Sequence, residues 1–263
     1  MSEQPLKSSR HDEICKFLSE QRYASVSRLS SLLQVSAATV RRDLGEMEET
    51  GQIQRVRGGA SLKVNDAVSE PSVFRRTREW APEKRLIGEA ASRLIPGGST
   101  VFIGSGSTAH CVARELAGRD ESFTVITNAL TVVDALIDNP NVELMLAGGM
   151  LRNAERSMIG HIATEALREL SADISIIGVQ GVDPVRGLTN DYLPEAMTDR
   201  AIVQSAHRLV VVADGRKFSR VRAVRIGEIR DATDLVTDDS APQHVVEQVR
   251  ALGPTVTVVN HGE

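Results

Sequence analysis

Apolar residues recur at helical spacing through the first fifty positions of the chain. The spacing predicts helices over about 11–21, around 29–33 and over about 36–50. The apolar face of these helices consists of Ile14, Phe17, Leu18, Leu29, Leu32, Leu33, Val40, Leu44 and Met47. Short helices with a common apolar face indicate a small helical domain.

A strand-like segment follows the third predicted helix. Apolar Ile53 and Val56 are interleaved with Arg55 and Arg57, and Gly58-Gly59 then provides a turn. The pattern predicts a β-hairpin with two exposed arginines. It would form a wing beside the three helices.

The segment 62–82 has no strong periodicity. It contains Pro71, Pro82 and a basic run over 75–78, which is more typical of a solvated face than of a binding site. We therefore predict a linker here. The expected organisation is a first domain over 1–61, the linker over 62–82 and a second domain over 83–263.

From Glu83 onward, helical patterns alternate with short runs rich in Val and Ile. This alternation predicts an α/β domain with a mainly parallel sheet covered by helices on both faces. The expected strands are 100–103, 124–126, 142–147, 174–179, 209–213, 235–237 and 255–260. The expected helices are 83–95, 108–116, 130–137, 162–170, 195–206 and one from about 242.

Composition and charge narrow the class of protein. Hydrophobic residues make up 41% of the 263 residues and charged residues 25%, as in globular domains, while the aromatic content of 3% argues against stacking on single-stranded nucleic acid. Residues 1–63 hold ten Lys and Arg against eight Asp and Glu, whereas the remainder holds 21 against 27. A modestly basic domain is thus joined to an acidic one.

Cysteine and histidine usage gives no sign of a metal centre. Cys15 and Cys111 lie far apart in apolar patterns, which predicts buried and reduced thiols. The six histidines are scattered, and no segment has the spacing of a P-loop or a dinucleotide fingerprint, so we expect neither a metal nor a cofactor. No apolar run approaches the roughly 20 residues of a membrane span, and no signal peptide is recognisable, so we expect a cytoplasmic location.

The start of the third predicted helix has the features of a DNA-reading helix. Ser36 is placed to cap it, small residues fill its first turn, and Arg41 and Arg42 lie on the side away from the apolar face. The alternative is an ordinary surface helix with solvated arginines. The candidate DNA-binding residues, wing included, are Ser36, Ala37, Ala38, Thr39, Arg41, Arg42, Arg55, Arg57, Gly58 and Gly59.

Ligands of parallel α/β sheets bind beyond the carboxyl ends of the strands. After the first strand of the second domain comes a loop of glycines and hydroxyl residues that leads directly into a helix: Gly104, Ser105, Gly106, Ser107 and Thr108. Backbone N–H groups, hydroxyls and the helix N-terminus suit a phosphate or a carboxylate. A plain tight turn would explain the same residues.

Polar residues or glycines also follow the other strands. They are Thr127, Asn128, Gly148, Gly149 and Lys217, each unremarkable alone. Together they predict a single ligand site at this edge of the sheet, with Lys217 as a cation for the same anion.

Residues 10–61, and above all VSAATVRRDLGEMEETGQIQRVRGGAS, resemble the DNA reader of the DeoR family of bacterial transcriptional repressors. The resemblance implies a winged helix-turn-helix that binds double-stranded operator DNA as part of a homo-oligomer, a dimer or a tetramer. This chain has Arg57 where the family usually has His before the glycine pair.

The second domain resembles the family's effector domain, which is similar in fold to ribose-5-phosphate isomerase and glucosamine-6-phosphate deaminase. The segments GSGST, ITNA, LAGGMLR, SMIG, ADISIIGVQGVD, GLTN and ADGRKFSR follow the family's order over about 83–239. The resemblance implies a repressor of a carbohydrate-metabolism operon that is controlled by a phosphorylated sugar or a related metabolite, held by the strand-end residues. The family more often has Asp where this chain has Gly104.

Two other functions remain open at this point. An isomerase or deaminase would need a poised carboxylate, for which Glu195 and Asp191 are the candidates. Arg152 is expected to form a surface salt bridge, and His110 to pack. A DNA-binding protein without any small-molecule ligand is the third possibility.

Overall fold

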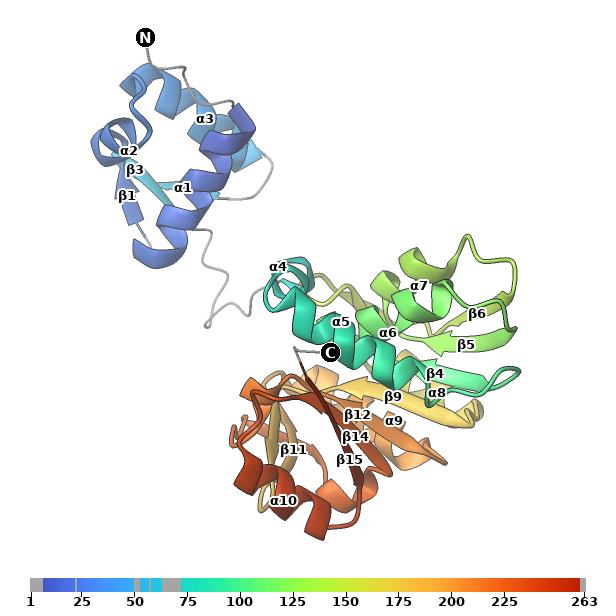
Figure 1. Ribbon diagram of the computed structural model, residues 1–263. Helices are drawn as coiled ribbons and strands as arrows, with labels where there is room; N and C mark the ends of the chain where they lie inside the picture. Colours follow the sequence, from blue (N-terminus) through green and yellow to red (C-terminus); the bar gives the residue numbers. More distant parts are fainter. Residues whose placement is uncertain (1–6, 22, 50–52, 57, 63–71, 261–263) are drawn as a thin grey trace. The chain divides into compact units, whose positions relative to one another are not determined.

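The computed structural model describes residues 7–21, 23–49, 53–56, 58–62 and 72–260 (Figure 1). The chain divides into two compact units, Met1–Glu70 and Pro71–Glu263. Each unit has its own apolar core. In the described part of the chain, no helix is both long and apolar enough to cross a membrane.

The first unit combines three helices with a three-stranded antiparallel sheet of strand order β1-β3-β2. Its elements are α1 (Lys7–Gln21), β1 (Tyr23–Ser25), α2 (Val26–Leu33), α3 (Ala37–Glu49), β2 (Ile53–Val56) and β3 (Gly59–Leu62). The predicted helices and the predicted hairpin are present. The predicted end of α3 at Thr50-Gly51 lies outside the described residues.

The core of this unit is made by the predicted apolar faces. Ile14, Leu18, Val40 and Met47 are fully buried, and Leu44 is nearly so. Of the expected core residues, Phe17 is half-buried and Leu32 is exposed. Leu29 and Leu33 face inward one turn apart, whereas Leu32, rotated by about 100° from Leu33, is 45% exposed.

The second unit is built on a seven-stranded parallel sheet of strand order β15-β14-β12-β9-β4-β5-β6. The strands are β4 (Thr100–Ile103), β5 (Phe123–Thr127), β6 (Val142–Leu146), β9 (Ile174–Gly178), β12 (Leu209–Val212), β14 (Asp234–Asp238) and β15 (Thr255–Val259). The chain proceeds outward from β4 in one direction and from β9 in the other. The boundary between β4 and β9 is therefore the switch point at which such sheets bind ligands.

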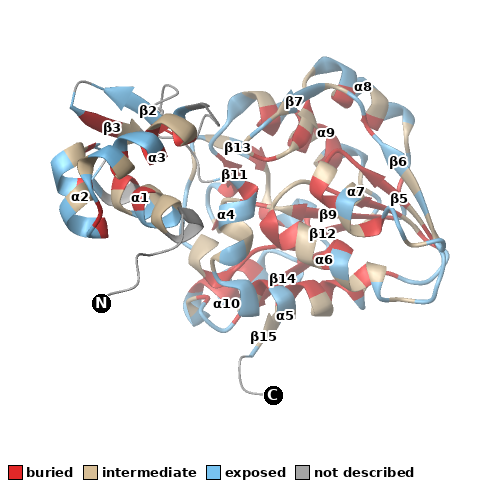
Figure 2. Ribbon diagram, turned by 90° about the horizontal axis from the view of Figure 1, so that it is seen from above, coloured by how far each residue is buried: buried red, intermediate tan, exposed pale blue. Residues whose placement is uncertain are grey.

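Helices cover both faces of this sheet (Figures 1 and 2). One core joins the sheet to α5 (Ala81–Ser92), α6 (Ser107–Ala117) and α7 (Leu130–Leu136). The other joins it to α8 (His161–Glu169), α9 (Leu193–Ser205) and α10 (Gln243–Ala251). Successive strand residues enter opposite cores, as Val101 and Phe102 do, because strand side chains alternate. The predicted α/β class is confirmed.

Several short elements were not predicted. They are α4 (Val73–Arg78), the hairpin of β7 (Met150–Arg152) and β8 (Ser157–Ile159), and a side sheet of β10 (Gly181–Asp183), β11 (Gly187–Asn190) and β13 (Val224–Gly227). The predicted linker over 62–82 is wrong in its second half. Residues 73–78 are helical and belong to the second unit because Val73 is buried there and its N–H donates to Ala154 O at 2.8 Å.

Candidate functional site

The N-terminus of α3 is capped as the sequence predicts. The backbone N–H of Thr39 donates to Ser36 Oγ at 3.1 Å, and the two hydroxyl oxygens lie 2.9 Å apart. Ala38 is exposed, whereas Ala37 and Thr39 are half-buried. The first turn of the helix therefore presents small side chains and one hydroxyl group.

The two faces of α3 differ as a DNA-reading helix requires. Val40 and Met47 are fully buried against the unit's core, and Arg41 and Arg42 are exposed on the other side. Neither arginine takes part in an ion pair within the part of the chain that the structure describes. Their guanidinium groups are available to an external anion or to the edges of bases.

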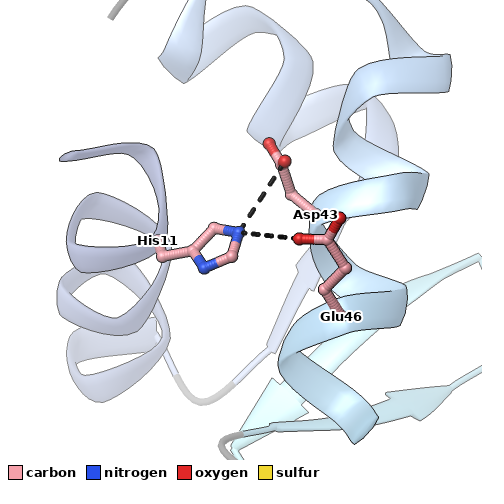
Figure 3. A group of neighbouring side chains, drawn as sticks. All are labelled: His11, Asp43 and Glu46. Carbon is pink, nitrogen blue, oxygen red and sulfur yellow. Dashed lines mark ion pairs between the residues drawn. The ribbon is translucent and has the colours of Figure 1, made fainter. Parts of the chain in front are cut away.

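A polar clamp of Arg10, His11, Asp43 and Glu46 holds α1 against α3, and Figure 3 shows the last three of these side chains. Arg10 donates from Nε and Nη2 to the two carboxylate oxygens of Asp43, at 2.8 and 2.9 Å. His11 points toward the same helix, with Nε2 3.7 Å from Asp43 Oδ1 and 4.0 Å from Glu46 Oε2. Burial opposes ionisation of Asp43, but Arg10 outweighs it and the pKa of this carboxyl lies below its ordinary value. Both oxygens of Asp43 accept from Arg10, so the ion pair joins α1 to α3.

The two glycines of the wing are required for different reasons, a backbone conformation at Gly58 and close packing at Gly59. Gly58 adopts a φ of 86°, which favours glycine, and a Cβ on Gly59 would lie 2.0 Å from the carbonyl oxygen of Ala24. Arg55 is exposed on β2. Arg57 lies outside the described residues, so the second predicted wing arginine has no structural account.

The loop after β4 has the predicted form of a turn into a helix N-terminus. Gly104 N–H donates to Ile176 O at 2.9 Å, and Gly106 caps α6 with a φ of 114°, a conformation open mainly to glycine. Ser107 and Thr108 are buried. The hydroxyl of Ser105 donates to Glu195 Oε1 at 3.2 Å.

Thr127 and Asn128 are fully buried and have structural partners. Thr127 Oγ1 donates to Ile103 O at 2.6 Å and accepts from the N–H of Ala129 at 3.0 Å, so it joins the ends of β4 and β5. Asn128 Nδ2 donates to Met158 O at 3.1 Å, which ties β5 to the β7–β8 hairpin. Both residues brace the strand ends.

The glycine pair after β6 leads into the β7–β8 hairpin, and Gly149 allows the hairpin to pack closely. Gly149 has a φ of 140°, and a Cβ there would lie 2.8 Å from Ile159 O. Gly148 is exposed, and its Cβ position would be 3.7 Å from a methyl carbon of Ile162. Close packing of the hairpin on α8 explains Gly149 without a ligand.

Lys217 lies after β12, and β9 separates that strand from β4. Two strand spacings, or about 10 Å, therefore separate the two loops at the sheet. Burial lowers the pKa of Lys217, and Asp214 opposes this effect. The charges that act on it besides Asp214 are those of Arg76, Arg216 and Arg222.

Lys84 on α5 belongs to the same basic group. Its ammonium donates to Glu79 O at 2.8 Å and to Arg76 O, and burial lowers its pKa to about 8, although Asp214 acts in the opposite direction. Arg216 lies over the ring of Trp80 at 4.2 Å and donates to Asp214 Oδ1 at 2.9 Å. The region brings basic residues of α4, α5 and the loop after β12 into one largely buried group around Asp214.

Glu195 lies at the centre of the predicted ligand site at the carboxyl ends of the strands, which we call the strand-end site. Its contacts were not predicted. It is 5% exposed and accepts from Ser105 Oγ at 3.2 Å and from Ser157 Oγ at 3.1 Å. Its other oxygen pairs with Arg152, whose guanidinium also lies 4.3 Å from the centre of the Tyr192 ring. The prediction of a surface salt bridge for Arg152 is therefore wrong, because its partner is buried.

Two further groups complete this region. Asp199, one turn after Glu195, accepts from Asn190 Nδ2 at 2.6 Å, and burial together with the charge of Glu195 raises its pKa well above the ordinary value. Asp191 is exposed and pairs with Arg222 at 3.4 Å. His110 packs as expected, with Nδ1 3.0 Å from Thr131 O.

Comparison with family models decides the identity of the chain. The DeoR-like helix-turn-helix domain matches residues 10–65, and the DeoR C terminal sensor domain matches residues 79–239. The chain belongs to the DeoR family. Both halves of the predicted resemblance are thereby confirmed.

Curated relatives in the family span nearly the whole chain. The HTH-type transcriptional repressor CsqR of Escherichia coli K12 is 35% identical over 89% of this chain and 88% of its own length. The glycerol-3-phosphate regulon repressor of the same organism is 32% identical over 92% and 94%. Transcriptional repressor AccR of Agrobacterium fabrum is 31% identical over 91% and 92%.

Solved structures similar to the chain include ribose 5-phosphate isomerase A from Neisseria gonorrhoeae. That similarity covers 55% of this chain and 54% of the isomerase at 16% identity, with a TM-score of 0.39. This similarity concerns the fold alone. Membership of the DeoR family makes this chain a DNA-binding transcriptional repressor and not an enzyme.

Proposed function

We propose that this DeoR-family repressor reads operator DNA with the N-terminal half of α3 and with the wing. The exposed pair Arg41 and Arg42, beside the capped first turn of α3, is the observation that carries this proposal. Arginine is suited to guanine edges in the major groove and to phosphates. The residues proposed to contact DNA are those predicted from the sequence, Ser36, Ala37, Ala38, Thr39, Arg41, Arg42, Arg55, Arg57, Gly58 and Gly59.

We further propose that a phosphorylated sugar or a similar phosphate ester controls the repressor at the carboxyl edge of the large sheet. The loop Gly104 to Thr108 at the switch point and the basic group around Lys217 support an anionic ligand. The names of two relatives point in the same direction, since both are glycerol-3-phosphate regulon repressors. We expect the repressor to be located in the cytoplasm and to control a carbohydrate operon in response to this effector.

The predicted effector residues are proposed to fall into two groups, those that contact the ligand and those that shape the site. Ser105, Gly106 and Lys217 are proposed to meet the ligand directly. Thr127, Asn128 and Gly149 are proposed to shape the site through the structural contacts described above, with Gly104, Ser107, Thr108 and Gly148 as its remaining borders.

A homo-oligomer is the proposed assembly. Large apolar side chains are exposed on neighbouring elements of the sensor unit, where α8 and α9 pack together: Met150 at 61%, Ile162 at 67%, Leu193 at 56% and Met197 at 60%. Such a patch favours a second copy of the chain, because operators are commonly read by symmetric dimers. Met197→Glu is expected to shift sedimentation toward the monomer, and an unchanged profile would place the interface elsewhere.

Operator binding by arginine variants tests the DNA proposal. Arg41→Ala is expected to raise the Kd for operator DNA roughly 5- to 150-fold, which corresponds to 1–3 kcal/mol for a good base contact. Arg168→Ala on α8 is the control, since Arg168 is also exposed but lies on the second unit. Equal operator affinity of both variants would contradict the proposed use of α3.

A further inference from the structure

A buried carboxylate occupies hydrogen-bond donors beside the loop after β4. Glu195 accepts from two hydroxyls, Ser105 Oγ and Ser157 Oγ, and pairs with the guanidinium of Arg152. Two hydroxyls and one guanidinium are the donors that an oxyanion such as phosphate requires. One of these donors, Ser105, belongs to the loop at the switch point.

The charge balance makes joint occupancy unfavourable. Glu195 and Asp199 lie one turn apart in α9 and are both buried. Burial and the charge of Glu195 raise the pKa of Asp199, and it is the carboxylate of Glu195 that pairs with the guanidinium of Arg152. A phosphate brought to Ser105 would be repelled by this carboxylate at short range and would compete with it for the same cation.

We propose that a phosphate monoester binds by replacing the carboxylate of Glu195 on Ser105 and Arg152. Arg152 is then an effector ligand, and Glu195 is a built-in competitor that occupies the site in the absence of effector. This inference rests on the proposed function in one respect, namely that the effector is a phosphate ester.

Replacement of Glu195 by phosphate on Arg152 would affect α4, the helix that follows the DNA-reading unit in the chain. Arg152 is the last residue of β7, and the turn that follows holds α4 by three contacts. Val73 N–H donates to Ala154 O at 2.8 Å, Arg76 pairs with Glu155, and Arg156 lies 5.3 Å from the centre of the Phe74 ring. When Arg152 leaves Glu195 for the phosphate, the turn and α4 move with it. α4 is the first described helix after the unit boundary at residues 70 and 71.

Binding of inorganic phosphate to three variants of the full chain tests this exchange by titration calorimetry in a chloride buffer. Glu195→Gln keeps the shape but removes the charge, so it is expected to bind phosphate at least tenfold more tightly than the wild type. Arg152→Gln is expected to lose binding at least tenfold. Glu165→Gln on α8, an exposed carboxylate paired with Arg168, is the control and is expected to match the wild type.

The outcomes separate this inference from the proposed function. Unchanged or weaker binding by Glu195→Gln, with a wild type that binds phosphate, overturns the competitor role alone. Absence of binding of phosphate and of glycerol 3-phosphate by every variant overturns the phosphate effector and this inference together. If Glu195→Gln fails to fold, Glu195→Asp replaces it, because its side chain is one methylene shorter and withdraws the carboxylate from Ser105 and Arg152. This variant is expected to bind phosphate several-fold more tightly than the wild type. Unchanged affinity would overturn the role of Glu195 as a competitor.

Hydrogen exchange measures the link to α4. Saturating phosphate is expected to speed exchange of the Val73 amide at least fivefold in the wild type, because its bond to Ala154 O is disturbed. The Ile137 amide, bonded to Val133 O at 2.9 Å in α7, is the internal reference. Unchanged exchange at Val73 with phosphate bound would overturn the coupling through the hairpin.

Discussion

Arg152 and Glu195 form the buried ion pair beside the loop after β4, whereas Ser36 and Gly106 act locally as helix caps. The caps and turns, such as Ser36 and Gly106, could be predicted because their role is local and their partners are close in sequence. The role of Arg152 could not be, because Glu195 lies 43 positions away on another element and only the fold brings them together. Lys217 could be placed at a strand end, but not among the basic residues of α4 and α5.

The wing glycines carry a prediction at this scale. Gly59→Ala places a methyl 2.0 Å from Ala24 O and is expected to destabilise the first unit by about 3 kcal/mol, in addition to weakening operator binding. Gly58→Ala has open space but keeps a φ of 86°, so it is expected to cost about 1 kcal/mol. Hydrogen exchange of α3 amides measures both losses. Equal losses of stability in the two variants would mean that the close packing of Gly59 on β1 contributes nothing beyond the backbone conformation of a wing glycine.

Elements of the second unit were predicted in proportion to their length and periodicity. Every strand of the large sheet was anticipated to within two residues, because buried runs of Val and Ile between helical patterns are distinctive. The β7–β8 hairpin and the side sheet have strands of three or four residues, too short to show alternation. α4 was assigned to a linker because four of its six residues are charged or polar, and its single buried residue, Val73, makes no pattern.

The clamp between α1 and α3 predicts a dependence of stability on pH. Because the folded pKa of Asp43 is depressed, its contribution is complete above the unfolded pKa of about 4 and is lost as pH falls through the folded value. Asp43→Asn is expected to lower the protection of α1 and α3 amides by about 2 kcal/mol at pH 7, and the difference from the wild type should vanish as pH falls through the folded pKa of Asp43. A difference that stays constant with pH would contradict the ion pair.

The junction of α4 and α5 predicts a second rise of stability with pH, in the alkaline range. Between about pH 8 and 10.5 the unfolded chain keeps a proton on Lys84 that the folded chain has lost, so rising pH stabilises the fold. Relative to Lys84→Met, the wild type is expected to gain up to roughly 3 kcal/mol across this range, at 1.36 kcal/mol per pKa unit. Urea unfolding followed by the fluorescence of Trp80, the only tryptophan, measures it. A constant difference would mean that Lys84 keeps its ordinary pKa.

For the whole molecule, sequence and structure both place the DNA-binding candidates in the first unit and the effector-binding candidates in the second. A modestly basic unit carries the exposed arginines of α3, and an acidic α/β unit carries the anion-binding candidates. A ligand can shift the repressor between its states only through a difference in affinity for them. The contacts of the β7–β8 hairpin with Glu195 and with α4 are the described features that support such a difference.

Operator binding with and without effector tests the central claim most directly. The operator Kd is measured for the wild type and for Lys217→Ala at one fixed salt concentration, with and without the phosphate ester that binds the wild type most tightly. We expect the ester to change the wild-type Kd at least tenfold. Lys217→Ala should keep the ligand-free Kd and lose most of that response. Loss of operator binding by folded Lys217→Ala, or a wild-type Kd that the bound ester leaves unchanged, would contradict a sensor unit that controls a separate DNA reader.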